Sequence, residues 1–423
     1  MTPSRATPRI SASTKPSKRH VLITGSSGYV GQHLIASLLL GDSSFDGREV
    51  SGAGAKKIGE CVGVDEDHVQ YELFCAYNSL STFKDDIDAL LRHQQQQLLP
   101  AHTPRANIHL IPNIDFSQHN YIDVIQQAIG GAHGDNANES LPLDAIIHLA
   151  ALSSPGYCEQ NAALTYKVNC PIDLLKFNAP IIYLSTDQVY EGNKQYYVED
   201  IDETVPVNVY GRSKLAFERV LLRRSDADGH VRALLNDREI GANDTCRRLL
   251  QGITIDSTTP SAHSNSVILR SSLILGPPPP LENGCKKGAY PSFLQFIEGR
   301  LQNSSPTEYF VNEFRSVVHI QDVITAIRHF LENGTATTQN NDVRIYNLGG
   351  SARVSRYDIA LEVARHLNID SSSAKAVDRP VGVGGAGGVP SPPDISMNVE
   401  KITRELNVLK MKGLTEIVAS TFV

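Results

Sequence analysis

The sequence predicts an α/β protein built on a doubly wound parallel sheet, with a smaller α/β region toward the C-terminus. Residues 20–24 form an apolar run, a glycine-rich segment follows at 25–31, and apolar residues continue at helical spacing from 34 to 40. Strand, glycine-rich turn and helix, in this order, are typical of the first unit of such a sheet. The chain has 423 residues, 41% of them hydrophobic, which is enough for a large core in one or two domains.

The glycine-rich segment has the spacing that a bound dinucleotide requires. It reads Gly25-Ser26-Ser27-Gly28-Tyr29-Val30-Gly31. Gly25 permits a tight turn, Gly28 lets the backbone approach a pyrophosphate, and Gly31 lets the helix sit close to the sheet. Backbone N–H groups at the start of the helix then face the phosphates. We therefore expect a dinucleotide cofactor at this turn.

Composition argues against several classes of partner. No apolar run reaches the roughly 18 residues that a membrane span needs. The net charge is −7, the pI is near 6.1, and no basic block is interleaved with aromatic residues, so we expect no nucleic-acid partner. The six cysteines lack C-x-x-C spacing, which favours reduced thiols in an intracellular protein over a disulfide frame or a zinc site. We expect neither a membrane nor a metal partner.

The first 19 residues differ from the rest of the chain. Residues 1–19 are basic, contain no acid and are rich in Ser, Thr and Pro. An organelle transit peptide has this composition, but no amphipathic apolar face is visible in the segment. We predict a disordered tail on a cytoplasmic protein, with organelle targeting by residues 1–19 as the alternative.

A tyrosine and a lysine four residues apart are the main candidates for chemistry. Tyr210 and Lys214 lie on one face of a predicted helix, one turn from each other. An ammonium near a phenol lowers the pKa of the phenol from about 10 toward working pH. Tyr210 can then exchange a proton with a carbonyl/alcohol pair. Thr186, at the end of a predicted strand, can hold the reacting oxygen.

Together these motifs resemble the extended short-chain dehydrogenase/reductase family, and the resemblance covers most of the chain from His20 onward. Residues 144–151 resemble its fourth strand and the small-residue turn under the cofactor, and residues 180–186 its fifth strand. Asn169 resembles the helix asparagine behind the active site. Residues 267–276 resemble the sixth strand and the entrance to the substrate region. Residues 315–322, an R-x-x-x-H-x-x-D segment, and residues 346–350 resemble two late signatures of the family.

The resemblance implies a Rossmann fold and an NAD(P)-dependent oxidoreductase. We expect residues 20–270 to form the cofactor-binding domain, with loop insertions near 41–70, 130–140 and 224–265. Residues 271–423 would be mainly the substrate-binding region, with some segments returning to the Rossmann core. The expected cofactor contacts are Gly25, Ser27, Gly28, Tyr29, Val30, Gly31, Asn78, Ser79, Asp115, Phe116, Leu149, Ala150, Ala151, Asn169, Tyr210 and Lys214.

The choice between NADP and NAD depends on which segment is the second strand. A strand at 58–64 would end at Asp65, and an acid there binds the ribose hydroxyl of NAD. A strand at 71–76 would end at Tyr77, Asn78 and Ser79 without an acid, which suits NADP. We favour the second strand and NADP. Asp115 resembles the aspartate that caps the adenine end, and it also fits a helix N-cap.

The segment after the fifth strand separates three reactions of this family. Nucleotide-sugar dehydratases carry two acids after the threonine, whereas this chain has Gln188 as the second residue, and an amide is no general base. Glu191 before Gly192 departs from the epimerases. The segment resembles dTDP-4-dehydrorhamnose reductases instead. Residues 393–398 resemble their R-P-x-x-S-x-L-D segment. No arginine comes just before Pro392, however, so this chain lacks at that position the arginine that the resemblance assigns to the nucleotide-diphosphate contact.

The resemblance therefore implies NAD(P)H-dependent reduction of a nucleotide-linked 4-keto sugar. Tyr210 would protonate the forming alkoxide, Lys214 would hold the nicotinamide ribose, and Thr186 would bond to the reacting oxygen. Asp187 would orient the substrate or cap the strand end, and Arg315 would lie at the substrate or at the domain interface. These reductases are often dimers, so the resemblance admits a homodimer, and the sequence leaves the oligomeric state open.

Two alternatives remain open from the sequence. The regulatory beta subunit of methionine adenosyltransferase resembles the same reductases, keeps the glycine-rich turn and the Y-x-x-x-K pair, and works by binding a synthetase partner. The other alternative is a different enzyme of the family, either an NAD-dependent nucleotide-sugar epimerase or a reductase of another small carbonyl substrate that is not a sugar. The residues quoted above bind cofactor in every case, so they do not separate catalysis from regulation.

Overall fold

The structure is a computed structural model, and it describes most of the chain in segments. The described residues are 18–40, 70–78, 82–97, 106–118, 120–131, 142–224, 265–281, 292–333, 343–379, 388–408 and 410–422. Within these segments, no helix combines the length and apolar character that crossing a bilayer requires.

A seven-stranded parallel sheet forms the centre of the molecule, in the order β11-β6-β5-β4-β1-β2-β3. Its strands are β1 (Lys18–Thr24), β2 (Gln70–Ala76), β3 (Ala106–Ile111), β4 (Ala145–His148), β5 (Ile181–Thr186), β6 (Val267–Ser271) and β11 (Arg344–Leu348). The strand order reverses between β1 and β4, so their carboxyl ends border a crevice, which is where ligands bind in open α/β sheets. The predicted doubly wound fold is confirmed.

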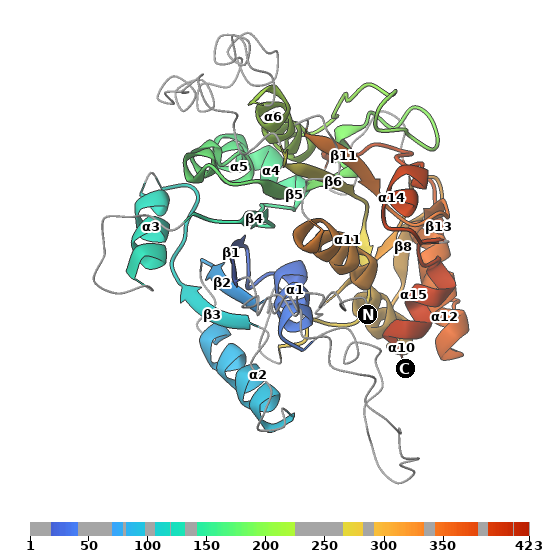
Figure 1. The fold of residues 1–423 in the computed structure, drawn as a ribbon. Coiled ribbons are helices and arrows are strands. Elements are labelled where there is room, and N and C mark those ends of the chain that lie inside the picture. Colours follow the sequence, from blue (N-terminus) through green and yellow to red (C-terminus); the bar gives the residue numbers. More distant parts are fainter. Residues whose placement is uncertain are drawn as a thin grey trace, which may run out of the picture.

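Helices cover both faces of this sheet (Figure 1). One apolar core lies between the sheet and the helices α1 (Tyr29–Leu40), α2 (Phe83–Gln97) and α11 (Ile320–Glu332). A second core lies under α3 (Tyr121–Gly131), α5 (Ala162–Asn169) and α6 (Val209–Arg224). Because both faces are covered, the strands are apolar without alternation, and Val21, Leu22 and Ile23 of β1 are fully buried.

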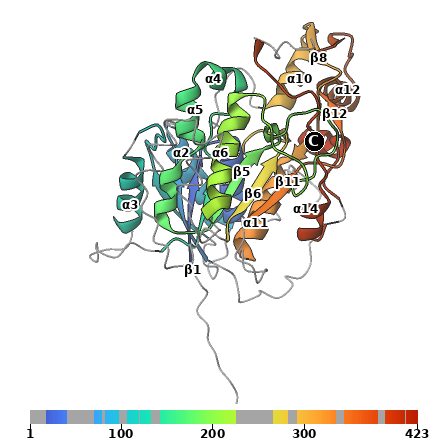
Figure 2. The same cartoon turned by 90° about the horizontal axis from the view of Figure 1, so that it is seen from above.

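The C-terminal elements gather at one end of the molecule (Figure 2). A third core joins α10 (Phe293–Gln302), α12 (Arg356–Leu367) and α15 (Leu414–Thr421) with the parallel pair β8 (Thr307–Phe310) and β13 (Ala374–Val377). The remaining described elements include β7 (Ile274–Leu275), β9 (Phe314–Arg315), β10 (Val318–His319), β12 (Val354–Ser355), α4 (Pro155–Gln160) and α14 (Glu400–Glu405). The pairs β7–β10 and β9–β12 place residues 314–319 close to the end of β6.

The structure corrects several predicted boundaries. Lys18 and Arg19 belong to β1 rather than to a tail, because the Lys18 ammonium pairs with buried Glu72 at 2.5 Å. The predicted insertions are each shorter at an end, because Gln70 starts β2, residues 130–131 end α3 and residue 224 ends α6. Residues 1–17, 41–69, 132–140 and 225–264 lie outside the described residues, as does Ser79, and the alternative strand at 58–64 falls within 41–69.

Candidate functional site

The glycine-rich turn lies at the point where the strand order reverses. Gly25 has φ +70°, a left-handed conformation that favours glycine. A Cβ atom there would be 2.6 Å from the Ala150 backbone nitrogen, and the Leu149 N–H donates to the Thr24 carbonyl at 3.2 Å. The turn is therefore pressed against residues 149–151, and the structure brings these two predicted cofactor segments together.

The other two glycines of the turn fit a pyrophosphate. A Cβ atom on Gly31 would be 2.5 Å from the Gly25 carbonyl oxygen, so α1 sits as close to the turn as predicted. A Cβ atom on Gly28 would have only the Gly25 oxygen near it, at 3.1 Å. The space that a side chain would occupy at Gly28 is therefore open to a ligand. The positive end of the α1 dipole begins at Tyr29. This arrangement fits the phosphates of a dinucleotide.

Two side chains of this turn region are engaged within the protein. The Tyr29 hydroxyl donates to the Pro277 carbonyl at 2.8 Å, and the Gln32 amide donates to the Ser27 carbonyl at 2.7 Å. Val30 packs against the first core. The phenol of Tyr29 thus connects α1 to the segment after β7. The cofactor contact expected of Tyr29 would then be made by its backbone N–H.

The end of β2 carries no acid. Both the backbone N–H and the hydroxyl of Ser26 donate to the Ala76 carbonyl, at 3.2 and 3.0 Å, so this strand end lies next to the glycine-rich turn. Tyr77 and exposed Asn78 follow. Residues 71–76 are thus the second strand, as we favoured on the sequence.

Asp115 caps a turn rather than the helix for which an N-cap was predicted, because the next helix, α3, starts only at Tyr121. Its carboxylate accepts a hydrogen bond from the Ser117 N–H at 2.9 Å and lies 3.5 Å from the Gln118 amide. Phe116 is buried and packs against the rings of Tyr121 and His148. The adenine contact of residues 115–116 stays a prediction.

Thr186 and Tyr210 meet at the end of β5. The two side chains share a hydrogen bond, and Lys214 follows one turn later on α6. The Asn169 side chain exchanges hydrogen bonds with the backbone of Leu152, at 2.8 and 3.0 Å, and donates to the Ser213 hydroxyl at 2.9 Å. Asn169 therefore ties the loop after β4 to the helix that carries the tyrosine–lysine pair.

The expected effect of Lys214 on Tyr210 is not found. Burial raises the pKa of Tyr210 well above its usual value; the bond with Thr186 opposes this, and the charge of Asp187 adds to it. The Lys214 ammonium instead donates to the Leu184 carbonyl at 2.9 Å and lies 4.8 Å from the centre of the Tyr183 ring. Burial also lowers the pKa of Lys214 to about 7. Burial of Tyr210 therefore has a larger effect on its pKa than the nearness of Lys214 on the helix, because the Lys214 side chain is directed at the Leu184 carbonyl.

Asp187 is buried beside Thr186. Its carboxylate accepts hydrogen bonds from the Thr186 hydroxyl at 3.2 Å and from the Ser272 hydroxyl at 2.9 Å. Burial raises the pKa of Asp187 to about 6, and the nearby positive charge of Arg315 opposes the rise. Asp187 thus links β5 to the segment after β6, while its role toward a substrate stays a prediction.

Gln188, the residue that departs from the dehydratase pattern, is tied down. Its side-chain carbonyl accepts a hydrogen bond from the Asn208 amide at 2.8 Å, and its backbone N–H donates to the Thr186 hydroxyl at 3.2 Å. Because its side chain is an amide, Gln188 cannot act as a second general acid or base in the way a carboxyl group could.

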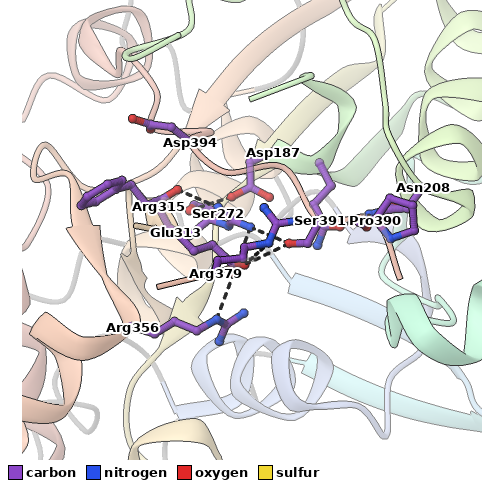
Figure 3. A network of polar contacts seen from close by, with 12 residues as sticks. Asp187, Asn208, Ser272, Glu313, Arg315, Arg356, Arg379, Pro390, Ser391 and Asp394 are labelled. Atoms are coloured by element: carbon purple, nitrogen blue, oxygen red, sulfur yellow. Dashed lines mark hydrogen bonds and ion pairs between the residues drawn. The ribbon is translucent and has the colours of Figure 1, made fainter. Parts of the chain in front are cut away.

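A cluster of arginines around one carboxylate lies next to Asp187 (Figure 3). Buried Glu313 contacts Arg315 at 3.2 Å, Arg356 at 3.1 Å and Arg379 at 3.7 Å. The Ser391 hydroxyl donates to the same carboxylate at 3.2 Å. The cluster carries more positive than negative charge, so it suits a further anion.

Sequence reasoning found Arg315 but missed Glu313, Arg356 and Arg379. The arginine that seemed to be missing before Pro392 has a counterpart in space, because Arg379 and Ser391 both contact the same Glu313 oxygen. The signal was the dipeptide Arg379-Pro380, which residues 381–390 separate from Ser391 in the sequence.

His319 is a structural residue rather than part of this cluster. Its Nδ1 accepts a hydrogen bond from the Gln321 N–H at 3.2 Å, and its Nε2 lies 3.1 Å from the Ser420 hydroxyl. Burial lowers its pKa to about 3, so the ring is neutral. In the described part of the chain, no group of His, Cys, Asp or Glu side chains is placed to hold a metal ion.

Comparison with known proteins agrees with this geometry. The model of the RmlD substrate binding domain matches residues 126–232. The chain is 37% identical over 89 residues to the dTDP-4-dehydrorhamnose reductase of Mycobacterium tuberculosis, which is 19% of this chain and 29% of that protein. It is 37% identical over 89 residues to methionine adenosyltransferase 2 subunit beta of Danio rerio, which is 20% of this chain and 27% of that subunit. The matches thus span less than a third of these two relatives.

Solved structures share the fold over nearly the whole chain. A dTDP-4-dehydrorhamnose reductase from Bacillus anthracis in complex with NADP has a TM-score of 0.54 at 16% identity and covers 96% of this chain and 99% of its own. A UDP-glucuronic acid 4-epimerase from Bacillus cereus, in complex with UDP-glucuronic acid and NAD, has a TM-score of 0.56 at 16% identity, with 95% and 97% covered. These solved structures share the fold of this chain, and residues 126–232 are similar to the RmlD substrate binding domain, in line with the resemblance that the motifs predicted.

Proposed function

We propose that the protein is an NAD(P)H-dependent reductase that acts on a nucleotide-linked 4-keto sugar. The observation that carries the proposal is the hydrogen-bonded pair Thr186 and Tyr210, placed at the end of β5 beside Lys214. A carbonyl oxygen in the crevice would meet two hydroxyl donors there. The glycine-rich turn that fits a dinucleotide lies at the neighbouring strand ends.

The cofactor would be held by the turn at 25–31, residues 149–151 and Lys214. When bound, the reduced nicotinamide supplies the hydride. The acid-free end of β2 at Asn78 supports NADP over NAD, since an acid there would repel the additional phosphate. The solved reductase that shares the fold, which is in complex with NADP, supports the same choice.

Tyr210 would supply the proton. Because burial keeps its pKa well above neutrality, Tyr210 is a neutral phenol at physiological pH and is ready to donate to an alkoxide. Thr186 would hold the same oxygen through its hydroxyl. Gln188 adds no second acid, so reduction without loss of water is favoured over dehydration.

The substrate would extend from this centre toward the arginine cluster. Arg315, Arg356 and Arg379 gather around Glu313 close to Asp187, and guanidinium groups bind phosphate oxygens well. Arg379 would supply the diphosphate contact for which no arginine precedes Pro392. Residues 271–423 would thus be mainly the substrate-binding region, apart from β11 in the sheet and α11 packed against it.

The test is oxidation of NADPH in the presence of a panel of nucleoside-diphosphate 4-keto sugars, followed by absorbance. Tyr210→Phe should lower turnover by about 10²-fold or more and leave NADPH binding within about twofold. Tyr157→Phe, at an exposed tyrosine of α4, is the matched control and should keep wild-type turnover. Unchanged turnover in Tyr210→Phe would remove Tyr210 from the mechanism.

A regulatory role is the second candidate, because the match to the methionine adenosyltransferase subunit is as strong as the match to the reductase. Under this proposal the protein binds cofactor and a synthetase partner without turning over a sugar. Co-purification with the methionine adenosyltransferase catalytic subunit, together with no NADPH oxidation across the sugar panel, would favour regulation over reduction.

A further inference from the structure

A third ionisable side chain follows the tyrosine–lysine pair on α6. Tyr210, Lys214 and Glu218 are spaced four residues apart, so successive members lie one turn from each other. Glu218 is fully buried and Lys214 is only 2% exposed. A buried carboxylate and a buried ammonium are each costly unless a partner compensates for the lost water.

Glu218 has its hydrogen-bond partners on the sheet. Arg270 of β6 reaches both carboxylate oxygens, at 2.8 to 3.2 Å, and the Ser185 hydroxyl of β5 donates at 2.5 Å. Ser185 directly follows Leu184, whose carbonyl accepts the bond from the Lys214 ammonium. The two polar side chains of α6 are thus tied to consecutive residues of one strand, just before Thr186.

The arginine partner is held from its other side. Arg270 donates to the Tyr190 hydroxyl at 2.9 Å, and that hydroxyl donates to the Asn347 side chain of β11 at 2.7 Å. The position of Glu218 is therefore determined by contacts with β5 and β6, and through Arg270 by β11. A carboxylate held in this way is preorganised and does not follow the movements of a bound ligand.

Few other groups near the Lys214 ammonium favour its charge. The ring of Tyr183 faces it from β5, and Arg270 of β6 is cationic and already engaged by Glu218. Burial lowers the pKa of His148 on β4, with the charge of Lys214 adding to the effect, so that ring is neutral. Burial raises the pKa of the Cys158 thiol on α4, which leaves it protonated. Among the described elements around Lys214, Glu218 is thus the carboxylate whose negative charge raises the pKa of Lys214 and opposes the effect of its burial.

We propose that Glu218, held by Arg270 and Ser185, is a positioning residue that keeps Lys214 protonated and directed at the end of β5. The inference rests on the proposed role of Lys214 toward the nicotinamide ribose. Without the charge of Glu218, Lys214 loses its proton at lower pH, and a neutral amine is a weaker donor to ribose hydroxyls.

The experiment measures the dissociation constant of NADPH by fluorescence between pH 5.5 and 9. Wild-type protein should lose affinity with a midpoint near pH 7, where Lys214 titrates. Glu218→Gln should move this midpoint down by about one pH unit, a tenfold change in proton concentration. Glu405→Gln, at a carboxylate paired with Arg344, removes one negative charge elsewhere and should leave the midpoint in place.

A second variant keeps the inference testable if Glu218→Gln fails to fold. Glu218→Gln leaves Arg270 buried without its partner, whereas Glu218→Met combined with Arg270→Met removes both charges and is better tolerated. The double variant also removes the cationic Arg270, so its downward shift should be smaller than that of Glu218→Gln. Lys214→Met should show no titration in this range.

The outcomes separate the inference from the function on which it rests. Wild-type protein that binds no NADPH overturns the proposed cofactor function and the inference with it. NADPH binding with the wild-type midpoint in both Glu218 variants overturns the role of Glu218 alone. A loss of affinity that is equal at every pH indicates a structural contact and contradicts the inference as well.

Discussion

Asp187→Asn should make the protein more stable at neutral pH. Asp187 is buried, and its carboxylate is charged at pH 7 because its pKa in the folded state is about 6. Asparagine has nearly the same shape and no charge. Its side chain can still accept the bond from Thr186, and the Ser272 hydroxyl can rotate to accept from the new amide.

The size of the effect follows from the shift in pKa. The pKa rises from 3.8 to about 6, a difference of about 2 units, and each unit corresponds to about 1.4 kcal/mol. Between these two values the folded state binds more protons than the unfolded state, so the free energy of unfolding falls as pH rises. The favourable contribution is complete below about pH 4 and is lost as pH rises through about 6. Asp187→Asn should therefore gain up to about 3 kcal/mol at pH 7.5.

Urea unfolding at pH 4.5, 6.0 and 7.5 measures this difference. The gap between variant and wild type should widen across the series and level off above pH 7. Asp115→Asn is the matched control of opposite sign: burial raises the pKa of Asp115, but its hydrogen bonds to Ser117 and Gln118 outweigh burial and lower it. That control should lose stability at pH 7.5. An Asp187→Asn protein that is less stable than wild type at pH 7.5, or a gap that does not change with pH, would refute the reasoning.

Three further predictions test other parts of the site. Gly25→Ala should cost about 1–3 kcal/mol of unfolding free energy and weaken NADPH binding, because its Cβ would meet the Ala150 backbone at a positive φ; unchanged urea midpoints would contradict this. Arg270→Met should cost about 3–5 kcal/mol, whereas pairing it with Glu218→Met should recover most of the loss in a double-mutant cycle. Arg379→Gln should weaken binding of dTDP by about tenfold or more in isothermal titration while NADPH binding stays constant, since each charge-assisted hydrogen bond contributes about 1.5–3 kcal/mol; equal dTDP affinities would exclude Arg379 from the substrate site.

Local patterns predicted the framework of the site well. The turn at 25–31 could be recognised because glycine spacing and the flanking strand and helix are adjacent in the sequence. Thr186, Tyr210 and Asn169 could be placed because each lies within a short segment of characteristic composition. The structure brings these residues together at the carboxyl ends of β1, β4 and β5, where the topology requires them.

Interactions between distant segments could not be predicted in the same way. The pKa of Tyr210 depends on burial by the whole fold, which a helical spacing of four residues does not report. Glu313 and Arg379 meet although 65 residues separate them in the chain, and an insertion parts Arg379 from Ser391. A search within one sequence window therefore finds no arginine where the folded protein has one.

The position of β11 has a consequence for how the chain is made. β6 is an inner strand only once β11 has paired with it along Val267–Ser271, and β11 ends at Leu348. During synthesis, the first six strands of the sheet emerge from the ribosome with an open apolar edge at β6 until more than 70 further residues have followed. Such an edge pairs readily with other chains. A stop codon between β6 and β11 should therefore yield aggregated protein rather than a free cofactor-binding half, and chaperone demand should be concentrated in this interval of translation.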